Sequence, residues 1–284
     1  MPRVHVVTDS GSDLSKEIRD TYNIHVVPLS IQFGDEIYRD GVDMHEETFY
    51  QRLTEGSVLP STCQPSPADF VKCYKEIAEP GDTIISVHLS SKLSGTYQSA
   101  FLATTMIDNL DIVVLDTKSA SIGIGLVAIA VAEAVQKGAT KDEAVALAHK
   151  VINEMGVYFV VDTLEYLKKN GRIGAAQAMV GALLNIKPIL TLVEGVVTPF
   201  DKVRGKAKAL KGIQDIIAEY SAKHPGQALR IGITHANSYA DAKKFSDEIA
   251  KTIDVHELII SYIGPTIGVH VGPGTIAVLF YPMD

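Results

Sequence analysis

The sequence contains no tryptophan and only two cysteines, Cys63 and Cys73, in 284 residues. Two cysteines in a chain of this length give no disulfide framework, so we expect both thiols to be reduced. The longest apolar run, residues 122–132, is too short to cross a bilayer, which needs about 20 residues. No signal-peptide pattern precedes the apolar segment 4–7. These absences predict a cytoplasmic protein without a transmembrane segment.

The sequence also lacks the short motifs of several enzyme classes. It has no Gly-x-x-x-x-Gly-Lys-Ser/Thr phosphate loop, no Gly-x-Ser-x-Gly nucleophile elbow, and no spacing of His, Cys, Asp and Glu that is typical of a zinc site. Segment 123–128 matches a dinucleotide fingerprint only loosely, because it does not directly follow a predicted strand, and we interpret its glycines as helix-packing positions. No pattern places a base near Cys63, so we do not expect a catalytic cysteine.

The sequence has fewer basic than acidic residues, 26 Lys or Arg against 34 Asp or Glu, which gives a net charge of −8. An acidic chain is an unfavourable partner for DNA, RNA or an anionic membrane surface, so we predict no nucleic-acid partner. Residues 1–155 carry 12 Lys or Arg and 22 Asp or Glu, a net charge of −10, whereas residues 156–284 carry a net charge of +2. The 46% of hydrophobic residues suffices for a sizeable core. Length and charge together predict two domains, 1–155 and 156–284.

Strand and helix patterns alternate along the first half, which predicts a mostly parallel sheet with helical crossovers. The second half adds a hairpin signal at Glu194-Gly195, and its strands mixed with helices predict an α+β layer. The predicted fold class is therefore α/β, with an N-terminal α/β domain and a C-terminal α+β domain. We expect strands at 4–8, 24–33, 83–89, 112–115, 157–161, two within 188–200, and at 229–234, 257–262 and 275–281, and helices ending near 22 and at 45–54, 67–78, 97–107, 122–137, 140–154, 164–169, 175–184, 204–222 and 239–251.

A hydroxyl-rich turn, residues 90–99, lies between the predicted strand 83–89 and the predicted helix 97–107. Ligands of open α/β sheets collect at the carboxyl ends of strands, and a helix start offers unpaired backbone N–H groups. Hydroxyls and Gly95 at such a place suit a carboxylate or a phosphate. Helix capping by Ser94 or Thr96 explains the same pattern without a ligand, and the residues alone leave both interpretations open.

Two further segments combine glycine with a side chain that suits an anion. His270 lies in the Gly/Pro-rich segment 264–274, which we expect to be a loop, and Arg172 lies in segment 168–174 beside two glycines. A guanidinium group can bind a carboxylate or a phosphate, and a histidine is a versatile hydrogen-bonding group. A structural histidine and a solvated surface arginine are equally compatible with these patterns. The rigid polar segment 60–67 precedes a predicted helix, where capping is again the alternative.

The densest basic cluster lies at residues 202–211. On a helix that begins at residue 204, Arg204, Lys208 and Lys211 share one face through i, i+4 and i+7 spacing. A solvated helix face explains such a cluster. The sharper interpretation is a docking surface for an acidic partner protein.

Taken together and in this order, these segments resemble the DegV family of bacterial fatty-acid-binding proteins. The resemblance spans nearly the whole chain, and the ordered set is more specific than any single piece. The matching segments are Val7-Thr8-Asp9-Ser10 with Asp13-Leu14, Ser61-Thr62-Cys63-Gln64-Pro65-Ser66, residues 90–98, Leu167 with Gly171-Arg172-Ile173, Leu184-Asn185-Ile186-Lys187-Pro188-Ile189, and residues 264–274.

The resemblance implies a two-domain α/β protein that buries a long-chain fatty acid between its domains and uses no cofactor. Carried over by position, the hydroxyls of Thr62 and Ser94 would bind the carboxylate. A supporting polar network would comprise Gly95, Thr96, Arg172 and His270. Arg204 resembles a partner-docking position, which we extend to Lys208 and Lys211. Cys63 stands where the family often has serine, which weakens any hydrogen bond expected from position 63.

The implied function is not enzymatic. The chain would present the carboxylate to the catalytic subunit of a separate ATP-dependent fatty-acid kinase, since it lacks the metal and phosphate clamps of kinase chemistry. Two alternatives stay open: a stand-alone acyl hydrolase or transferase that uses Ser94 and His270, and a binding module for another small carboxylate or phosphate. Burial of an acyl chain of about 16 carbons contributes on the order of 10 kcal/mol, at about 0.8 kcal/mol per methylene. The aromatic content of 7% is compatible with an aliphatic tunnel.

Overall fold

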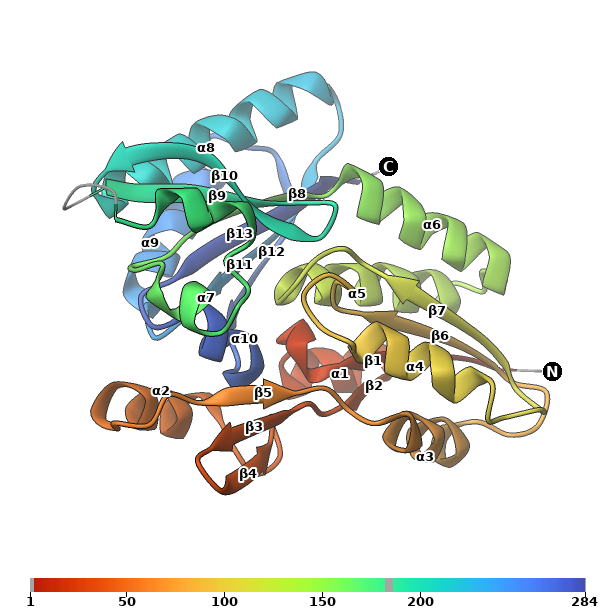
Figure 1. Cartoon of the computed structure of the whole chain (residues 1–284). Coiled ribbons are helices and arrows are strands. Elements are labelled where there is room, and N and C mark those ends of the chain that lie inside the picture. Colours follow the sequence, from red (N-terminus) through yellow and green to blue (C-terminus); the bar gives the residue numbers. More distant parts are fainter. Residues whose placement is uncertain (1–2, 182–185, 284) are drawn as a thin grey trace.

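The computed structural model describes residues 3–181 and 186–283, whose strands form three sheets (Figure 1). The first sheet has four parallel strands in the order β2-β1-β6-β7. These strands are β1 (Val4–Asp9), β2 (Ile24–Val27), β6 (Thr83–His88) and β7 (Asp111–Asp116). The predicted parallel sheet of the first half is thereby confirmed.

The second sheet has six strands in the order β10-β9-β8-β13-β11-β12 and is mixed, because β11 and β12 are parallel and the other neighbours are antiparallel. Its strands are β8 (Gly156–Val160), β9 (Ile186–Val193), β10 (Val196–Arg204), β11 (Leu229–His235), β12 (Val255–Tyr262) and β13 (Ile276–Pro282). The predicted hairpin turn at Glu194-Gly195 is confirmed, and both residues have the positive φ angles of a two-residue hairpin turn. The two sheets together confirm the α/β class.

A small third sheet corrects the prediction of one strand over 24–33. Pro28 lacks the N–H that a ladder needs, and the chain leaves the parallel sheet there. It re-enters as β3 (Ser30–Phe33), which pairs with β4 (Glu36–Arg39) and β5 (Ser61–Cys63). Neither β4 nor β5 was predicted, and β5 lies in the rigid polar segment 60–67.

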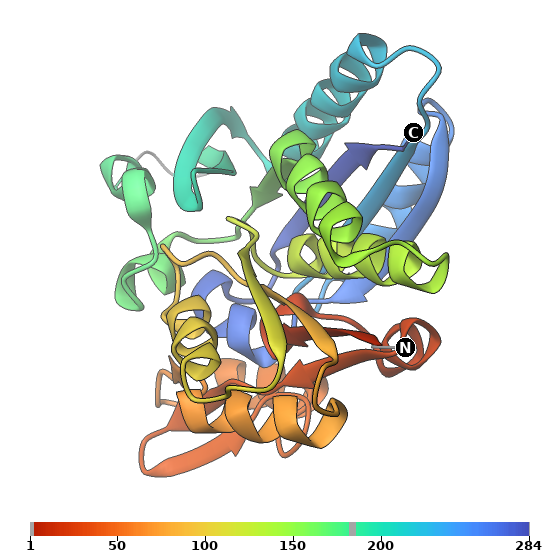
Figure 2. The same cartoon turned by 90° about the vertical axis from the view of Figure 1, so that its right-hand side faces the viewer.

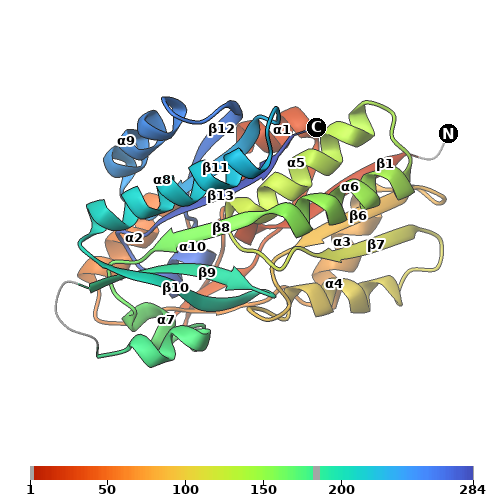
Figure 3. The ribbon, with the colours of Figure 1, turned by 90° about the horizontal axis from the view of Figure 1, so that it is seen from above.

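Helix α5 (Ile122–Gln136) occupies the centre of the molecule, between the two larger sheets (Figure 3). It contacts β1 and β6 on one side and β11 and β13 on the other, and every residue from Ile122 to Ala132 is buried. A Cβ on Gly123 would lie 2.4 Å from Leu279 Cδ2, and one on Gly125 would lie 2.7 Å from Leu14 Cδ2. The glycines therefore permit close helix packing, as interpreted from the sequence.

Four helices cover the outer faces of the two larger sheets (Figure 2). α3 (Pro67–Ile77) and α4 (Thr96–Thr104) share a hydrophobic cluster with the parallel sheet, and α8 (Lys206–Lys223) and α9 (Tyr239–Ala250) share one with the six-stranded sheet. A third and larger cluster lies between the sheets and includes both Val6 and Leu279. The remaining helices are α1 (Lys16–Tyr22), α2 (Glu46–Glu55), α6 (Lys141–Glu154), α7 (Glu165–Lys169), α10 (Pro265–Val271) and two 3₁₀ segments, η1 (Ser10–Ser12) and η2 (Gly174–Met179).

Three helix predictions need correction. The Gly/Pro-rich segment 264–274 is not only a loop, because it contains α10, which has Pro265 in its first turn and His270 in its last. α8 begins at Lys206 rather than at residue 204, so Arg204 ends strand β10 and shares no helix face with Lys208 and Lys211. The helix expected over 175–184 is a 3₁₀ segment that ends at Met179, and residues 182–184 lie outside the described residues.

The division into domains 1–155 and 156–284 stays a proposal. It falls between α6 and β8, so the strands of the six-stranded sheet all come from the second part and those of the other two sheets from the first. Within the described ranges, no helix has both the length and the apolar character that a membrane span requires. Cys63 is exposed and Cys73 is partly buried, both as free thiols, and burial raises the pKa of Cys73 to about 11.

Candidate functional site

A largely apolar cavity lies beside α10, between the carboxyl end of β6 and the six-stranded sheet. The space among its lining atoms is about 910 Å³, a figure that includes space open to solvent. Much of its wall is aliphatic and comes from both halves of the chain, for example Leu29, Leu89, Leu93, Leu192, Val197 and Leu279. Such a wall suits an extended hydrocarbon chain.

Four of the residues singled out from the sequence line this cavity: Thr62, Ser94, Arg172 and His270. Thr62 Oγ1 lies 2.9 Å from His270 Nε2. Arg172 donates through Nε to the carbonyl of Leu93 at 3.1 Å and through Nη1 to the carbonyl of Asn170 at 2.8 Å. The structure thus gathers side chains from β5, the turn before α4, the segment after α7, and α10 around one cavity.

Strand alternation explains why Thr62 faces the cavity. Side chains along a strand point alternately to its two faces, so Thr62 and Gln64 share one face while Cys63 takes the other. Thr62 and Gln64 line the cavity, and Cys63 is exposed and does not. The departure from the family pattern at Cys63 therefore leaves the cavity wall unchanged. Gln64 was not predicted as a site residue, although its i+2 spacing from Thr62 was the available signal.

Ser94 lies in the turn between β6 and α4. Its Oγ is 2.9 Å from Thr96 Oγ1 and accepts a hydrogen bond from the backbone N–H of Thr96 at 3.3 Å. Thr96 is fully buried and supports Ser94 from behind. A Cβ on Gly95 would lie 2.3 Å from Gln64 Oε1, so Gly95 leaves room for Gln64. The N-cap residue of α4 is Gly95, which has no side-chain capping bond, but the Ser94 hydroxyl accepts from the first N–H of the helix and lines the cavity.

The charge balance at this end favours an anion. No Asp or Glu of the described residues lines the cavity, and within residues 3–181 and 186–283 Arg172 forms no ion pair with an acidic side chain. Burial, together with the charge of Arg172, lowers the pKa of His270 to about 4, so the imidazole is neutral at pH 7. His270 Nδ1 is buried and has no hydrogen-bond partner in the described part of the chain. The unpaired charge of Arg172 and the unpaired Nδ1 of His270 are thus found at the same cavity.

A second polar group along the cavity was not predicted. Ser121 Oγ donates to Asp13 and lies 3.3 Å from Thr234 Oγ1, and Thr266 Oγ1 donates to Asp40. Burial raises the pKa of Asp13 well above its usual value and that of Asp40 to about 6. The three hydroxyls line the cavity, whereas the two acids lie behind them. These contacts join segments that are far apart in the sequence, so no local sequence pattern predicts them.

The geometry of Ser94 and His270 differs from that of a nucleophile and its base. The two side chains make their hydrogen bonds to Thr96 and Thr62 rather than to each other. His270 Nδ1 also lacks the acidic partner that orients the imidazole in a serine hydrolase. In the part of the chain that the structure describes, no group of three or more His, Cys, Asp or Glu side chains is arranged to hold a metal ion.

The predicted docking residues lie away from the cavity. Arg204, Lys208 and Lys211 are exposed, and none of them lines it. Lys211 pairs with Asp215 on the next turn of α8, at 3.0 Å between Nζ and Oδ1. Arg204 and Lys208 are therefore the two members of the predicted set whose charges are more available to a partner.

Comparisons of the sequence and of the structure with known proteins identify the same family. The sequence profile described as "Uncharacterised protein, DegV family" matches residues 3–283. Protein DegV of Bacillus subtilis (strain 168) is 36% identical over 279 residues, which cover 97% of this chain and 98% of that protein. A fatty-acid-binding DegV family protein from Thermus thermophilus superposes with a TM-score of 0.92 at 35% identity, covering 99% of this chain and 100% of the other. The structure of DegV from Bacillus subtilis, described as a fatty acid binding protein, superposes with a TM-score of 0.91 at 34% identity and full coverage of both chains.

Proposed function

The chain belongs to the DegV family, and we propose that it is a carrier that binds one long-chain fatty acid in the cavity beside α10. The observation that carries this proposal is the pairing of an aliphatic cavity with one polar end. There Arg172 has no acidic partner among the described residues, and Thr62, Ser94 and His270 offer hydrogen bonds. A fatty acid has the same two parts, an apolar chain and one anionic group.

The polar end meets the requirements of a buried carboxylate. An anion that leaves water is stable only where hydrogen bonds or an opposite charge replace its hydration. The hydroxyls of Thr62 and Ser94 supply donors that need no desolvated ion pair, and the guanidinium of Arg172 supplies the charge at the same cavity. The neutral His270 can donate from Nε2 to Thr62 Oγ1, which leaves the Thr62 hydroxyl proton for the carboxylate without adding a second positive charge. We therefore assign Thr62 and Ser94 to the carboxylate, with Arg172 and His270 as its support.

The acyl chain supplies most of the affinity. Each buried methylene contributes about 0.8 kcal/mol, so an aliphatic wall rewards every carbon that the cavity encloses. The side chains of Leu192, Val197 and Leu279 belong to the six-stranded sheet, and those of Leu89 and Leu93 follow β6 of the parallel sheet. The acyl chain of the fatty acid would consequently lie between the two sheets, and side chains from both sheets would shield it from solvent.

We assign this protein the role of a substrate-presenting subunit rather than a catalyst. Ser94 and His270 are not hydrogen-bonded to each other, which argues against a hydrolase that uses them. A separate ATP-dependent fatty-acid kinase would phosphorylate the carboxylate, whose oxygen attacks the γ-phosphate and releases ADP. Arg204 and Lys208 give such a partner an exposed basic surface that is separate from the cavity.

The decisive experiment is organic extraction of the purified protein followed by mass spectrometry. We expect about one equivalent of long-chain fatty acid per chain, and rebinding of the same acid after its removal. A polar metabolite without any long-chain acid would overturn the proposal. Chromogenic acyl esters give the complementary test: we expect no turnover by the wild type, whereas turnover that Ser94→Ala abolishes would establish the hydrolase instead.

A further inference from the structure

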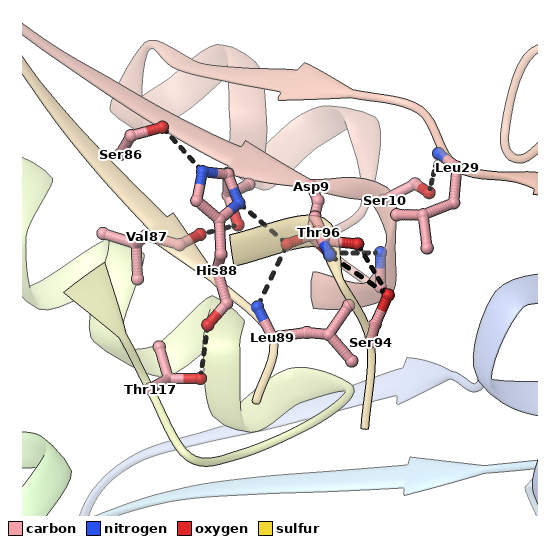
Figure 4. Close-up of polar contacts among 12 residues, drawn as sticks. Asp9, Ser10, Leu29, Ser86, Val87, His88, Leu89, Ser94, Thr96 and Thr117 are labelled. Atoms are coloured by element: carbon pink, nitrogen blue, oxygen red, sulfur yellow. Dashed lines mark hydrogen bonds and ion pairs between the residues drawn. The ribbon is translucent and has the colours of Figure 1, made fainter. Parts of the chain in front are cut away.

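A chain of buried hydrogen bonds runs through the parallel sheet behind the polar end of the cavity. Ser86 Oγ lies 2.8 Å from the hydroxyl of Tyr74 and 2.7 Å from His88 Nε2. His88 Nδ1 in turn lies 2.9 Å from Asp9 Oδ2. Figure 4 shows Ser86, His88 and Asp9 on the neighbouring strands β6 and β1.

This arrangement has the order of a Ser-His-Asp triad but cannot reach a substrate. Ser86, His88 and Asp9 are each 0% exposed, and none of them lines the cavity. The Ser86 hydroxyl is engaged by Tyr74 as well as by His88. A nucleophile needs an open approach for the carbonyl that it attacks. We therefore expect these hydrogen bonds to act indirectly, by fixing the positions of the residues that they join.

Asp9 is the residue at which these contacts converge. Its Oδ2 accepts hydrogen bonds from His88 and from the backbone N–H of Leu89 at 3.1 Å, and its Oδ1 accepts one from the N–H of Gly11 at 3.0 Å. Asp9 ends β1, and Leu89 is the first residue after β6. A buried carboxylate is stabilised by such donors, and the same donors are fixed by it. Asp9 therefore determines where the chain leaves β6.

The segment that leaves β6 carries the polar end of the cavity. Leu89, Leu93 and Ser94 line the cavity, and the turn is closed by hydrogen bonds from the N–H groups of Leu93 and Ser94 to the carbonyl of Ser90, at 2.9 and 3.1 Å. The carbonyl of Leu93 also accepts the hydrogen bond from Arg172 Nε. A shift of Leu89 would consequently move both the Ser94 hydroxyl and the acceptor that orients Arg172.

We propose that Asp9 and His88 are positioning residues for the ligand carboxylate, acting through Leu89 on Ser94 and Arg172. The inference rests on the proposed function, because it concerns the same cavity. Asp9 holds the start of the turn, and His88 holds Asp9 in the orientation in which its second oxygen faces Gly11. The apolar wall contributed by the six-stranded sheet does not depend on either residue.

The test compares two ligands of equal chain length, a long-chain fatty acid and the corresponding fatty alcohol. Wild type should bind the acid more tightly than the alcohol. Asp9→Asn places an amide N–H₂ against groups that are themselves donors, and should weaken binding of the acid by roughly tenfold or more while binding of the alcohol changes by less than about twofold. A role in stability alone would lower the affinity for both ligands together.

Two further variants control this comparison. His88→Asn keeps a donor near the position of Nδ1 and should retain the preference for the acid, whereas His88→Leu should lose it. Glu133→Gln removes the charge of the partly buried ion pair between Glu133 and Arg230, which lies outside the cavity, and should lower the melting temperature without changing the acid-to-alcohol ratio. If Asp9→Asn does not fold, the two His88 variants decide.

The outcomes separate the two proposals. An acid-to-alcohol ratio in Asp9→Asn and His88→Leu equal to that of the wild type would overturn the positioning role, as would a parallel loss of both ligands. A wild type that binds neither ligand, or both equally, would instead overturn the proposed function itself.

Discussion

Thr62 and His270 are 208 residues apart in the sequence, yet Thr62 Oγ1 lies 2.9 Å from His270 Nε2 at the wall of the cavity. The contact joins β5 of the small sheet to the last turn of α10. Because the neutral imidazole accepts at one nitrogen and donates at the other, this contact leaves either the Thr62 hydroxyl proton or His270 Nδ1–H available to a ligand. The polar end of the cavity is thus assembled by the fold rather than by any single segment.

The first prediction concerns the Thr62 hydroxyl. Thr62→Val keeps the shape of the side chain but removes its hydrogen bond to the carboxylate and to His270. We expect the affinity for a long-chain fatty acid to fall by about 1–3 kcal/mol, the effect of removing a partner from a buried polar group. Isothermal titration with the delipidated protein measures this difference.

A matched ligand and a matched variant sharpen this measurement. The fatty alcohol of equal length should bind Thr62→Val about as well as it binds the wild type, since its chain makes the same contacts. Thr62→Ser restores a hydroxyl and should recover most of the affinity for the acid. Equal affinities of the wild type and Thr62→Val for the acid would remove Thr62 from the site.

Local patterns predicted the parts of the site that local structure determines. The position of Ser94 in a turn between a strand and a helix was predicted, because these elements follow one another within residues 83–104. The contacts of Thr62 with His270, and of Ser121 with Asp13, depend on how distant segments pack, and no spacing encodes them. The resemblance to a family brought Thr62 and His270 together where the pattern of residues alone could not.

The errors in the predicted fold also arise because tertiary packing, rather than local sequence, decides the structure at these places. The glycines of segment 264–274 disfavour a helix by propensity, yet α10 forms because most of its side chains are buried. Two local signals were present, Pro265 in the first turn and Gly272 after the last. Pro28 interrupts the single strand predicted over 24–33, and only the tertiary structure decides that the chain changes sheets there.

The second prediction concerns the pH dependence of stability. His270 has a pKa of about 4 in the folded protein and about 6.5 when unfolded. The unfolded chain therefore binds more protons at this residue between these values, so its contribution makes stability fall as the pH drops from about 6.5 to 4. The full effect is roughly 3 kcal/mol. His270→Gln cannot titrate, and the difference in unfolding free energy between wild type and variant should shrink as the pH falls through this window.

Asp40 provides a control of opposite sign. Burial raises its pKa to about 6, so the folded protein binds more protons at Asp40 and this contribution to stability is lost as the pH rises from about 4 to 6. The difference in unfolding free energy between the wild type and Asp40→Asn should consequently move in the direction opposite to that for His270→Gln. Chemical denaturation at several pH values measures both, and a pH-independent difference for His270→Gln would contradict the assignment.

The third prediction separates lipid binding from partner docking. Arg204 ends β10 with its side chain exposed and does not line the cavity, so Arg204→Glu should leave the affinity for the fatty acid within about twofold. Formation of acyl phosphate by the kinase should slow by roughly tenfold, because reversal of an exposed charge acts on the rate of association. Lys244→Glu, which reverses an exposed charge on α9, is the control and should have a much smaller effect. Weaker lipid binding with an unchanged rate of phosphorylation would contradict the docking role.

The last prediction concerns the length of the acyl chain. Ala277 lines the cavity from the middle of the six-stranded sheet, between Thr234 and Phe159 on the neighbouring strands. Ala277→Phe fills space that the tail would occupy, and each methylene that is excluded costs about 0.8 kcal/mol of binding free energy. The ratio of affinities for an 18-carbon acid over a 12-carbon acid should therefore fall by roughly tenfold or more. Ala218→Phe, on the exposed face of α8, adds the same ring outside the cavity and should leave the ratio unchanged. An Ala277→Phe protein that folds and keeps the chain-length preference of the wild type would show that the tail does not run along β13.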